Sequence, residues 1–358
     1  MARLTQAALG LLTLTLLTSC GGHGETVIRT SSPVVALALD GKRLAWSDCH
    51  AIHLRQGRSE LRLRLPDAVD PALTCQSGGR LVLAGDRIGW LFETNRGSGP
   101  LSSFALGVSS VSSGATRIFR ANRGYGEKFS AGVPGSIAAG GKKVLWTWPR
   151  VTLGGPADAI YYCDHYSKQP PCTVRISAAS VHGWRGRIIP AAAPIATAHG
   201  WFAAGVVKTG KLAQASVVGP RLVVVRRLSD GSVVTRVRTR GPVDGLALSR
   251  RLLAVQGVGA IDLYDLPGGH FIRTVDVHLL SDPQFTSPLA VRGSDLVAWG
   301  HGRIEKIDAT TGERTILIRA PGLTAVALDG SRIAWATSSG NGGVIRTRSL
   351  ELPDRTRA

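Results

Sequence analysis

Short apolar runs alternate with glycine-rich or polar bends along most of the chain. In residues 34–46 an apolar run, the bend Asp40-Gly41 and a second apolar run ending in Trp46 follow one another. An Asp-Gly bend between two apolar runs is a strong β-hairpin signal, because a two-residue type I′ turn needs positive φ at both central positions. The segment therefore predicts two antiparallel strands joined by such a turn.

This hairpin pattern recurs at seven places in the chain. Residues 324–335 repeat it almost completely, with Asp329-Gly330 at the bend and Trp335 at the end, and weaker copies lie at 86–90, 141–146, 194–202, 249–255 and 293–299. A second strand–turn–strand pattern follows at intervals, most clearly at 221–240, 260–275 and 303–319. Each unit therefore predicts two hairpins, which is four antiparallel strands.

Recurring four-stranded units are typical of a β-propeller, in which each blade buries its faces against its neighbours. The seven copies predict an all-β fold, a seven-bladed β-propeller of four-stranded antiparallel blades. The last unit has its third strand near residues 344–349, and an isolated apolar stretch at 26–29 precedes the first blade. We expect this N-terminal strand to complete the last blade and close the ring, because closure removes an exposed strand edge.

Two short motifs carry a resemblance to known propellers. Tyr264-Asp265 stands where a WD repeat has Trp-Asp, and Asp40-Gly41-Lys42 resembles the Asp-Gly-Lys bend of TolB-type bacterial propellers. On these motifs and their repetition, residues 26–352 resemble WD-repeat-like and TolB-type propellers. The resemblance implies a non-catalytic binding scaffold that presents a face of loops to a partner.

The N-terminus has the pattern of an export signal. A start carrying Arg3 is followed by an apolar stretch at 7–17, which is shorter than the ~20 residues of a membrane-spanning helix. The next residues, Leu17-Thr18-Ser19-Cys20, resemble the lipobox of bacterial lipoproteins, which implies that Cys20 is lipidated and becomes the first mature residue. The alternative is a chance cysteine beside an ordinary cleavage site.

These patterns divide the chain into four parts. We expect a lipoprotein signal peptide at 1–19, a lipidated tether at 20–25, one β-propeller domain at 26–352 and a C-terminal tail at 353–358. The predicted location is the extracytoplasmic side of the cell membrane, reached through the lipid anchor. We expect the protein to be a monomer.

Four cysteines besides Cys20 make an even number, which in an exported chain favours two disulfides. Cys163 and Cys172 bracket a polar loop that could bring their thiols together, which leaves Cys49 to pair with Cys75. The alternative is a metal site made of Cys163, His165 and Cys172.

The net charge of +19 comes mostly from arginine. Several arginines occupy alternate positions of the expected outer strands, which places each set on one face: Arg62 and Arg64; Arg236, Arg238 and Arg240; Arg346 and Arg348. Such a rim could bind an anionic envelope polymer, anionic lipid or an acidic protein; alternatively it only keeps the outer strands solvated. Nucleic acid is not an expected partner, because the basic residues are not interleaved with stacking aromatics.

Two long connections, at 93–133 and 149–191, are where binding residues are expected, because long loops on a rigid scaffold commonly carry binding sites. Their aromatic and polar candidates for a contact surface with an envelope protein are Tyr125, Tyr161, Tyr162, His165, Tyr166 and Trp184. The alternative is that Tyr161 and Tyr162 alternate along a blade strand.

The chain contains no catalytic, metal or cofactor motif that we recognise, so no enzymatic activity and no cofactor are predicted. The alternative function is an envelope enzyme, lactonase-like or quinoprotein-like, with its site in the central channel of the propeller. Carboxylates or histidines converging on the axis would favour that alternative.

Overall fold

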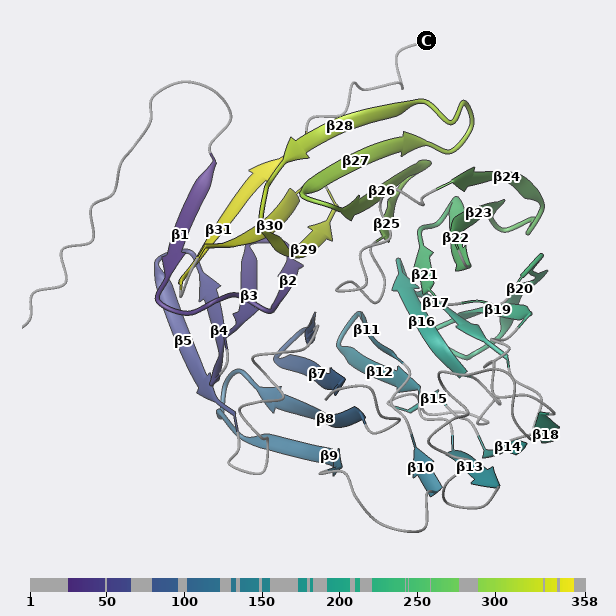
Figure 1. The fold of residues 1–358 in the computed structure, drawn as a ribbon, viewed down its shortest axis with the longest axis horizontal. Coiled ribbons are helices and arrows are strands. Elements are labelled where there is room, and N and C mark those ends of the chain that lie inside the picture. The colour runs from purple at the N-terminus through teal and green to yellow at the C-terminus, as the bar shows by residue number, and fades with distance from the viewer. Residues whose placement is uncertain are drawn as a thin grey trace, which may run out of the picture.

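The computed structural model describes most of the chain. The described residues are 25–48, 50–65, 79–95, 102–122, 130–132, 136–147, 150–154, 173–178, 181–182, 192–206, 210–212, 221–241, 243, 245–257, 259–276, 289–330, 332–339 and 342–350. They are built from β-strands (Figure 1). No helix among them has the length and apolar character required to cross a membrane.

Among the described residues, six of the seven four-stranded antiparallel sheets are complete blades. The first two blades are β2 (Ala36–Asp40), β3 (Arg43–Ser47), β4 (Ala51–Gln56), β5 (Ser59–Arg64), and β6 (Gly79–Ala84), β7 (Arg87–Asn95), β8 (Ser102–Ser110), β9 (Thr116–Asn122). The next two are β16 (Ala192–Ala198), β17 (Trp201–Gly205), β19 (Leu222–Arg227), β20 (Val233–Arg238), and β21 (Gly245–Leu248), β22 (Leu252–Gly257), β23 (Ala260–Asp265), β24 (Phe271–Asp276). The last two are β25 (Leu289–Arg292), β26 (Asp295–Gly300), β27 (Arg303–Asp308), β28 (Arg314–Arg319), and β29 (Leu323–Asp329), β30 (Arg332–Ser339), β31 (Gly342–Ser349), β1 (Thr26–Thr30).

The expected count of seven four-stranded blades is wrong. The third repeat unit forms a three-stranded sheet of β11 (Ser136–Gly140), β12 (Lys143–Thr147) and β15 (Val181–His182) among the described residues. The long connection between β12 and β15 separates the two hairpins that the repeat pattern assigned to one blade. The all-β propeller of four-stranded antiparallel blades is confirmed, with six complete blades.

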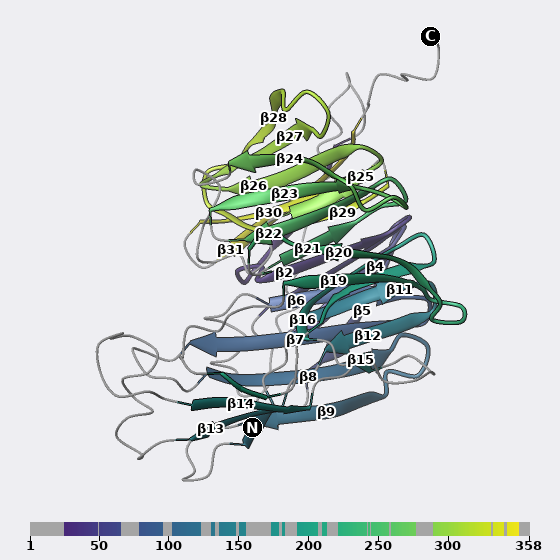
Figure 2. The ribbon, with the colours of Figure 1, turned by 90° about the vertical axis from the view of Figure 1, so that its right-hand side faces the viewer.

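The long connections contribute strands to a further sheet that the sequence did not predict. This insertion sheet has the order β10-β13-β14-β18, and its strands are β10 (Ser130–Gly132), β13 (Arg150–Gly154), β14 (Thr173–Ala178) and β18 (Gly210–Leu212). In Figures 1 and 2, β13 and β14 lie at the lower end of the molecule. Segments expected to be loops therefore contain paired strands drawn from three different connections.

In each complete blade and in the three-stranded sheet, one strand faces the centre of the ring; we call these the first strands, and they are β2, β6, β11, β16, β21, β25 and β29 (Figure 1). Neighbouring blades pack through apolar side chains. Trp90 is buried in a cluster that joins the first and second blades. Trp299 and Trp335 belong to one cluster that joins the last two blades. Burying these large side chains between sheets is what makes the ring a single core, because each sheet alone would leave both apolar faces in water.

The N-terminal strand lies in the last blade. β1 pairs antiparallel with β31, and Ile28 stands opposite Ile345. Ile28 also belongs to a buried cluster that contains Trp46 of the first blade and Ala325 of the last. The two ends of the repeat array are therefore adjacent, and the first and last copies of the hairpin pattern are neighbours in space.

The hairpin turns differ in type from the expectation. Asp40 pairs with Arg43 at the strand ends, so the two central residues are Gly41 and Lys42, not Asp40 and Gly41. Of the central residues Gly41 alone has a positive φ, +56°, which is the pattern of a type II′ turn. His199-Gly200 does have positive φ at both positions, as a type I′ turn requires.

These turns are linked from blade to blade. Arg332 donates to the carbonyl oxygen of Gly41, and the equivalent Arg43 donates to the carbonyl oxygen of Gly85 in the next blade. The Asp329 carboxylate also accepts a hydrogen bond from the N–H of Gly41. The near-identical motifs at opposite ends of the sequence therefore form two successive clamps around the ring.

The clamps define two faces of the ring. We call the face with the turns after the first strands (41–42, 85–86, 141–142, 199–200, 250–251 and 293–294) the turn face. The opposite face, on which the first strands begin, is the pocket face. The strands β3, β9 and β12 end on the pocket face as well, because each is antiparallel to a neighbour that runs from the pocket face to the turn face: β2, β8 and β11.

Candidate functional site

A cavity of ≈ 280 Å³ lies on the ring axis, which we call the axial pocket. Its lining comes from the starts of the first strands, with Trp299 from a second strand. The apolar lining residues are Val35, Ala36, Leu37, Leu81, Val82, Ile137, Ile195, Leu246, Leu289, Trp299, Ala325 and Val326; the rest are Gly79, Arg80, Ser136 and Thr324. Most of the lining side chains are therefore apolar, while polar atoms contribute nearly half of the pocket surface.

Polar contacts at the pocket wall link three neighbouring first strands. Arg80 on β6 donates from a terminal guanidinium nitrogen to Ser136 Oγ on β11 at 3.0 Å. The Ser136 hydroxyl in turn donates to the carbonyl oxygen of Ile195 on β16 at 3.4 Å. Arg80 is thereby held at the pocket wall by a buried serine.

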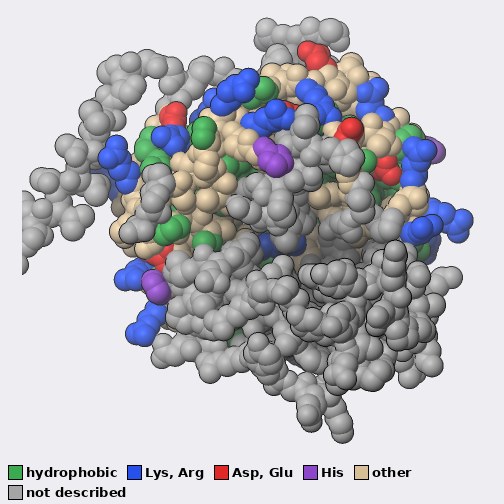
Figure 3. All heavy atoms as spheres, viewed as in Figure 1, with side chains coloured by type: hydrophobic (Ala, Val, Ile, Leu, Met, Phe, Trp, Pro, Cys, Tyr) green, Lys and Arg blue, Asp and Glu red, His purple; other side chains and the backbone are tan. Residues whose placement is uncertain are grey.

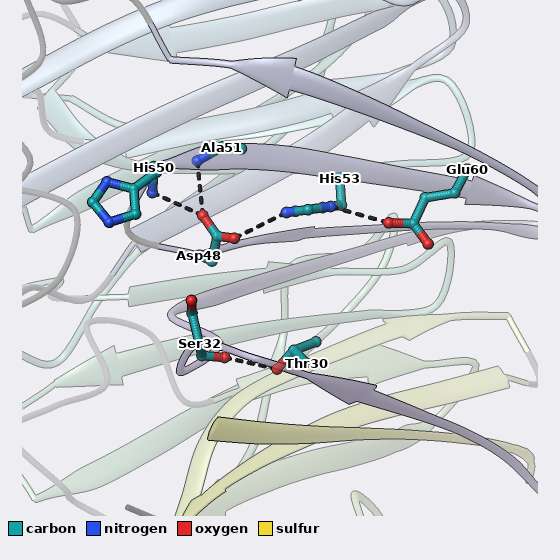
Figure 4. Close-up of polar contacts among 7 residues, drawn as sticks. All are labelled: Thr30, Ser32, Asp48, His50, Ala51, His53 and Glu60. Atoms are coloured by element: carbon teal, nitrogen blue, oxygen red, sulfur yellow. Dashed lines mark hydrogen bonds and ion pairs between the residues drawn. The ribbon is translucent and has the colours of Figure 1, made fainter. Parts of the chain in front are cut away.

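A second polar cluster lies in the first blade, where β3 turns into β4 (Figure 4). His53 Nε2 is 3.0 Å from Asp48 Oδ2, and His53 Nδ1 is 3.1 Å from Glu60 Oε1. The imidazole stacks on Trp46 with ring centroids 4.9 Å apart and an interplanar angle of 4°. A neutral imidazole has one donor nitrogen, whereas the imidazolium has two. Because each ring nitrogen faces a carboxylate, this geometry favours the imidazolium form.

The pKa values of the cluster follow from this geometry. Burial, the largest single influence, acts to raise the pKa of Asp48, but hydrogen bonds from His53 and from the N–H groups of His50 and Ala51 outweigh it and place the pKa at about 2. Burial likewise acts to lower the pKa of His53, but its hydrogen bonds to Asp48 and Glu60 and their charges raise that pKa above 6.5. His53 therefore connects Asp48 at the β3–β4 corner to Glu60 on β5.

The contact residues predicted from sequence lie outside the described residues: Tyr125, Tyr161, Tyr162, His165, Tyr166 and Trp184. The described strands that precede them can be placed. β9 precedes Tyr125 and ends on the pocket face, and β12, which precedes the long connection at 149–191, ends there too. Their grouping into a contact surface stays a prediction.

The cysteines of the predicted anchor and disulfides, Cys20, Cys49, Cys75, Cys163 and Cys172, also lie outside the described residues. Cys49 falls between Asp48 and His50, so its neighbours in the chain belong to the polar cluster of the first blade. Lipidation, both disulfides and the alternative metal site stay predictions.

The predicted arginine rim is present in part. Arg62 and Arg64 are exposed on β5, and Arg236 and Arg238 are exposed on β20, each set on one face of an outer strand. Lys and Arg side chains lie around the periphery of the view in Figure 3.

Arg346 and Arg348 do not belong to an outer strand. They lie on β31, and β1 is the strand outside it. Arg346 pairs with Glu25 at 3.2 Å, and Arg348 donates to the carbonyl oxygen of Leu317 in the neighbouring blade at 2.6 Å. The prediction that these two arginines lie on an outer strand is wrong, because the N-terminal strand pairs with the outer edge of β31.

The sequence did not single out Arg80 or the Asp48–His53–Glu60 cluster. Arg80 and Ser136 are 56 residues apart and meet only because neighbouring first strands converge on the axis. His53 meets Glu60 across the β4–β5 hairpin, whose register pairs Arg55 with Glu60. The sequence could have indicated this contact only through the hairpin register. The short turn at 57–58 fixes that register, which places Glu60 diagonally opposite His53.

Among the residues that the structure describes, no group of three or more His, Cys, Asp or Glu side chains is placed to hold a metal ion. The described lining of the axial pocket contains neither a carboxylate nor a histidine. The arrangement that would favour the enzyme alternative is therefore not found in this part of the chain.

The fold is similar to solved structures at low sequence identity. A chain of the mitotic checkpoint complex aligns with 97% of this chain and 100% of its own length, at 12% identity and a TM-score of 0.50. The WD40 domain of Neurospora crassa Pan2 aligns over 90% of this chain and 91% of its own, at 10% identity and a TM-score of 0.46. BamB from Moraxella catarrhalis aligns over 87% and 85%, at 11% identity and a TM-score of 0.43. No protein-family model and no curated protein matches the sequence. At these identities the likeness concerns the fold alone.

Proposed function

We propose that this protein is a non-catalytic interaction scaffold that binds an envelope protein on its pocket face. The observation that carries the proposal is the asymmetry of the ring. The turn face is made of short turns clamped to one another, for example by Arg332 and Arg43. The pocket face has the axial pocket and the strand ends from which the long connections leave. A rigid scaffold with long connections on one face is an arrangement that commonly serves recognition.

We further propose that lipid on Cys20 holds the scaffold at the extracytoplasmic side of the membrane. Only a few residues separate Cys20 from β1, which pairs with β31 from Thr26 onward. In this proposal β1 closes the ring and also connects the lipid anchor to the folded domain. The domain division into signal peptide, tether, propeller 26–352 and tail is part of the same proposal.

Site-specific photo-crosslinking tests the binding face. A photoreactive amino acid is placed at Tyr125 or Tyr162, and at Lys42 or Lys142 as matched controls, because both lysines are exposed on the turn face. Irradiation of intact cells should give one discrete crosslinked species from the tyrosine positions and none from the lysine positions. Crosslinks from the lysine positions alone would refute the proposed binding face, and an absence of discrete species at all four positions would refute the scaffold.

The anchor is tested separately by Cys20→Ala. The wild-type protein should partition into the detergent phase of a membrane extract, and the variant should remain with its uncleaved signal or in the aqueous phase. Mass spectrometry of the mature N-terminus should show diacylglyceryl on the Cys20 sulfur. An unmodified mature N-terminus at any position would contradict lipidation.

A further inference from the structure

The turns that follow the first strands are rich in basic side chains. We call these turns and the residue on each side of them the inner turns: 40–43, 84–87, 140–143, 198–201, 249–252, 292–295 and 329–332. In the part of the chain that the structure describes, five of their cations are exposed and have no side-chain partner: Lys42, Arg87, Lys142, Arg250 and Arg251. We propose that the inner turns bind the anionic headgroups of a lipid bilayer. The proposal rests on the membrane location proposed above, and it adds which face of the ring lies against the membrane.

The acidic side chains of the inner turns are fewer, and each is held in a local contact: Asp40, Asp86, Asp295 and Asp329. Asp40 pairs with Arg43, and Asp86 accepts a hydrogen bond from the Ser112 hydroxyl at 2.7 Å. The outer turns of the same face, between third and fourth strands, carry both signs, for example Arg58 and Asp230. The positive potential of the turn face is therefore strongest over the inner turns, near the axis.

The arrangement of the cations fits a planar array of negative charges. The five exposed cations come from the turns β2–β3, β6–β7, β11–β12 and β21–β22, which belong to four different sheets. Because the first strands surround the axis and all end at the turn face, these turns form a ring. A bilayer surface can meet such a ring at several points at once. Each basic residue close to an anionic membrane surface strengthens binding about fivefold.

The N-terminal strand enters the ring from the same face. Arg332 follows the last inner turn and pairs with Ser349 at the end of β31, and Thr26 pairs with Thr347 near that end. β1 therefore begins at the turn face and runs toward the pocket face. Cys20 lies six residues before Thr26, a reach of at most about 22 Å. A lipid on Cys20 would therefore hold the turn face closer to the bilayer than the pocket face.

Vesicle binding tests the proposal with the full mature chain carrying Cys20→Ser, which prevents lipidation. Sedimentation should show binding to phosphatidylcholine vesicles that contain about one-third phosphatidylglycerol, and little binding to phosphatidylcholine alone. Raising NaCl from about 0.1 to 1 M should release the protein, because the Debye length falls from about 10 to 3 Å. Equal binding to both kinds of vesicle, or binding to neither, would overturn the proposal. Because neither anchor nor partner is present, this failure is distinguishable from a failure of lipidation or of pocket-face binding.

Substitutions then locate the lipid-binding face. One triple variant removes exposed cations of the inner turns: Lys42→Gln, Lys142→Gln and Arg250→Gln. The matched control removes the same charge from exposed positions of outer strands: Arg62→Gln, Arg238→Gln and Arg319→Gln. The turn variant should lose about a hundredfold in affinity for the anionic vesicles, and the control less than about fivefold. Equal losses would show that net charge alone matters, and a larger loss in the control would assign binding to the outer strands; either result overturns the proposal.

Soluble polyglutamate distinguishes a lipid surface from a flexible anionic polymer. Added at the same concentration of negative charge as the vesicles, it should displace little of the bound protein, because a flexible chain loses conformational entropy when it is ordered along the ring. Full displacement would assign the inner turns to a soluble polyanion and overturn the proposal for lipid.

Discussion

Ile28→Ala tests whether the N-terminal strand is an integral part of the ring. Ile28 is 9% exposed and faces Ile345 across the β1–β31 pairing. The substitution removes about three buried carbon groups, at about 0.8 kcal/mol each, so the lost transfer free energy is about 2.4 kcal/mol. A residual cavity raises the usual cost of such changes to about 2–5 kcal/mol. Because β1 is an edge strand that can shift to fill part of the space, we expect about 2–3 kcal/mol.

Val27→Ala is the matched control for this experiment. Val27 is the preceding residue on the same strand and 50% exposed, so both variants lose a β-branched side chain but only one loses buried area. We expect the control to change the free energy of unfolding by about 0.5 kcal/mol or less. The assay is urea unfolding followed by circular dichroism, together with amide hydrogen exchange of residues 343–347, the partners of β1.

The two readouts distinguish local from global effects. If β1 detaches before the ring unfolds, amide exchange at 343–347 should accelerate in Ile28→Ala while the urea midpoint moves little. If the ring unfolds as one unit, both should change. The claim that β1 closes the ring would be refuted if the two variants had free energies of unfolding within about 0.5 kcal/mol of each other and unchanged amide exchange at 343–347.

Two further predictions concern the blades themselves. Gly107→Ala should destabilise the protein by about 1–3 kcal/mol, because a Cβ there would lie 2.6 Å from two ring atoms of the buried Trp90. Gly241→Ala is the control, since a Cβ there has no atom within 4 Å, and it should change thermal stability little. An equal loss of thermal stability in both variants would contradict the packing argument. The His53 pKa is raised on folding, so its contribution to stability should be complete below pH 6.5 and lost as the pH rises through the folded-state value. Asp48 has the opposite sign: its contribution should be complete above pH 3.8 and lost as the pH falls toward 2. Urea midpoints measured across pH for the wild type and His53→Gln check both, and parallel pH profiles would contradict the role of His53.

The repeat architecture could be predicted because each blade is encoded locally. The bend Asp40-Gly41 and its copy Asp329-Gly330 each specify a hairpin through neighbouring residues, and the recurrence of such hairpins specifies stacked sheets. The number of complete blades could not be predicted in the same way. In the third unit the chain leaves the blade after β12 and contributes β13 and β14 to another sheet, and periodicity alone does not show which strands pair.

The candidate site was beyond sequence reasoning for a physical reason. Arg80 lies at the pocket wall because it donates to Ser136, which in turn donates to the Ile195 carbonyl oxygen. These residues lie on three different sheets, and they meet only because the blades converge on the axis. The sequence instead pointed to the long connections, since composition and length are visible without a fold. Arg346 shows a different error: its alternation suggested an outer strand, although the predicted strand at 26–29 already placed residues 344–349 inside the last blade.

Amide hydrogen exchange of the purified protein–partner complex, compared with the free protein, tests most directly the claim that the pocket face is the binding face. The account predicts slower exchange in pocket-face segments such as 50–51, 301–302 and 321–322, and unchanged exchange in the turns at 41–42, 85–86 and 293–294. Protection confined to those turns would contradict it.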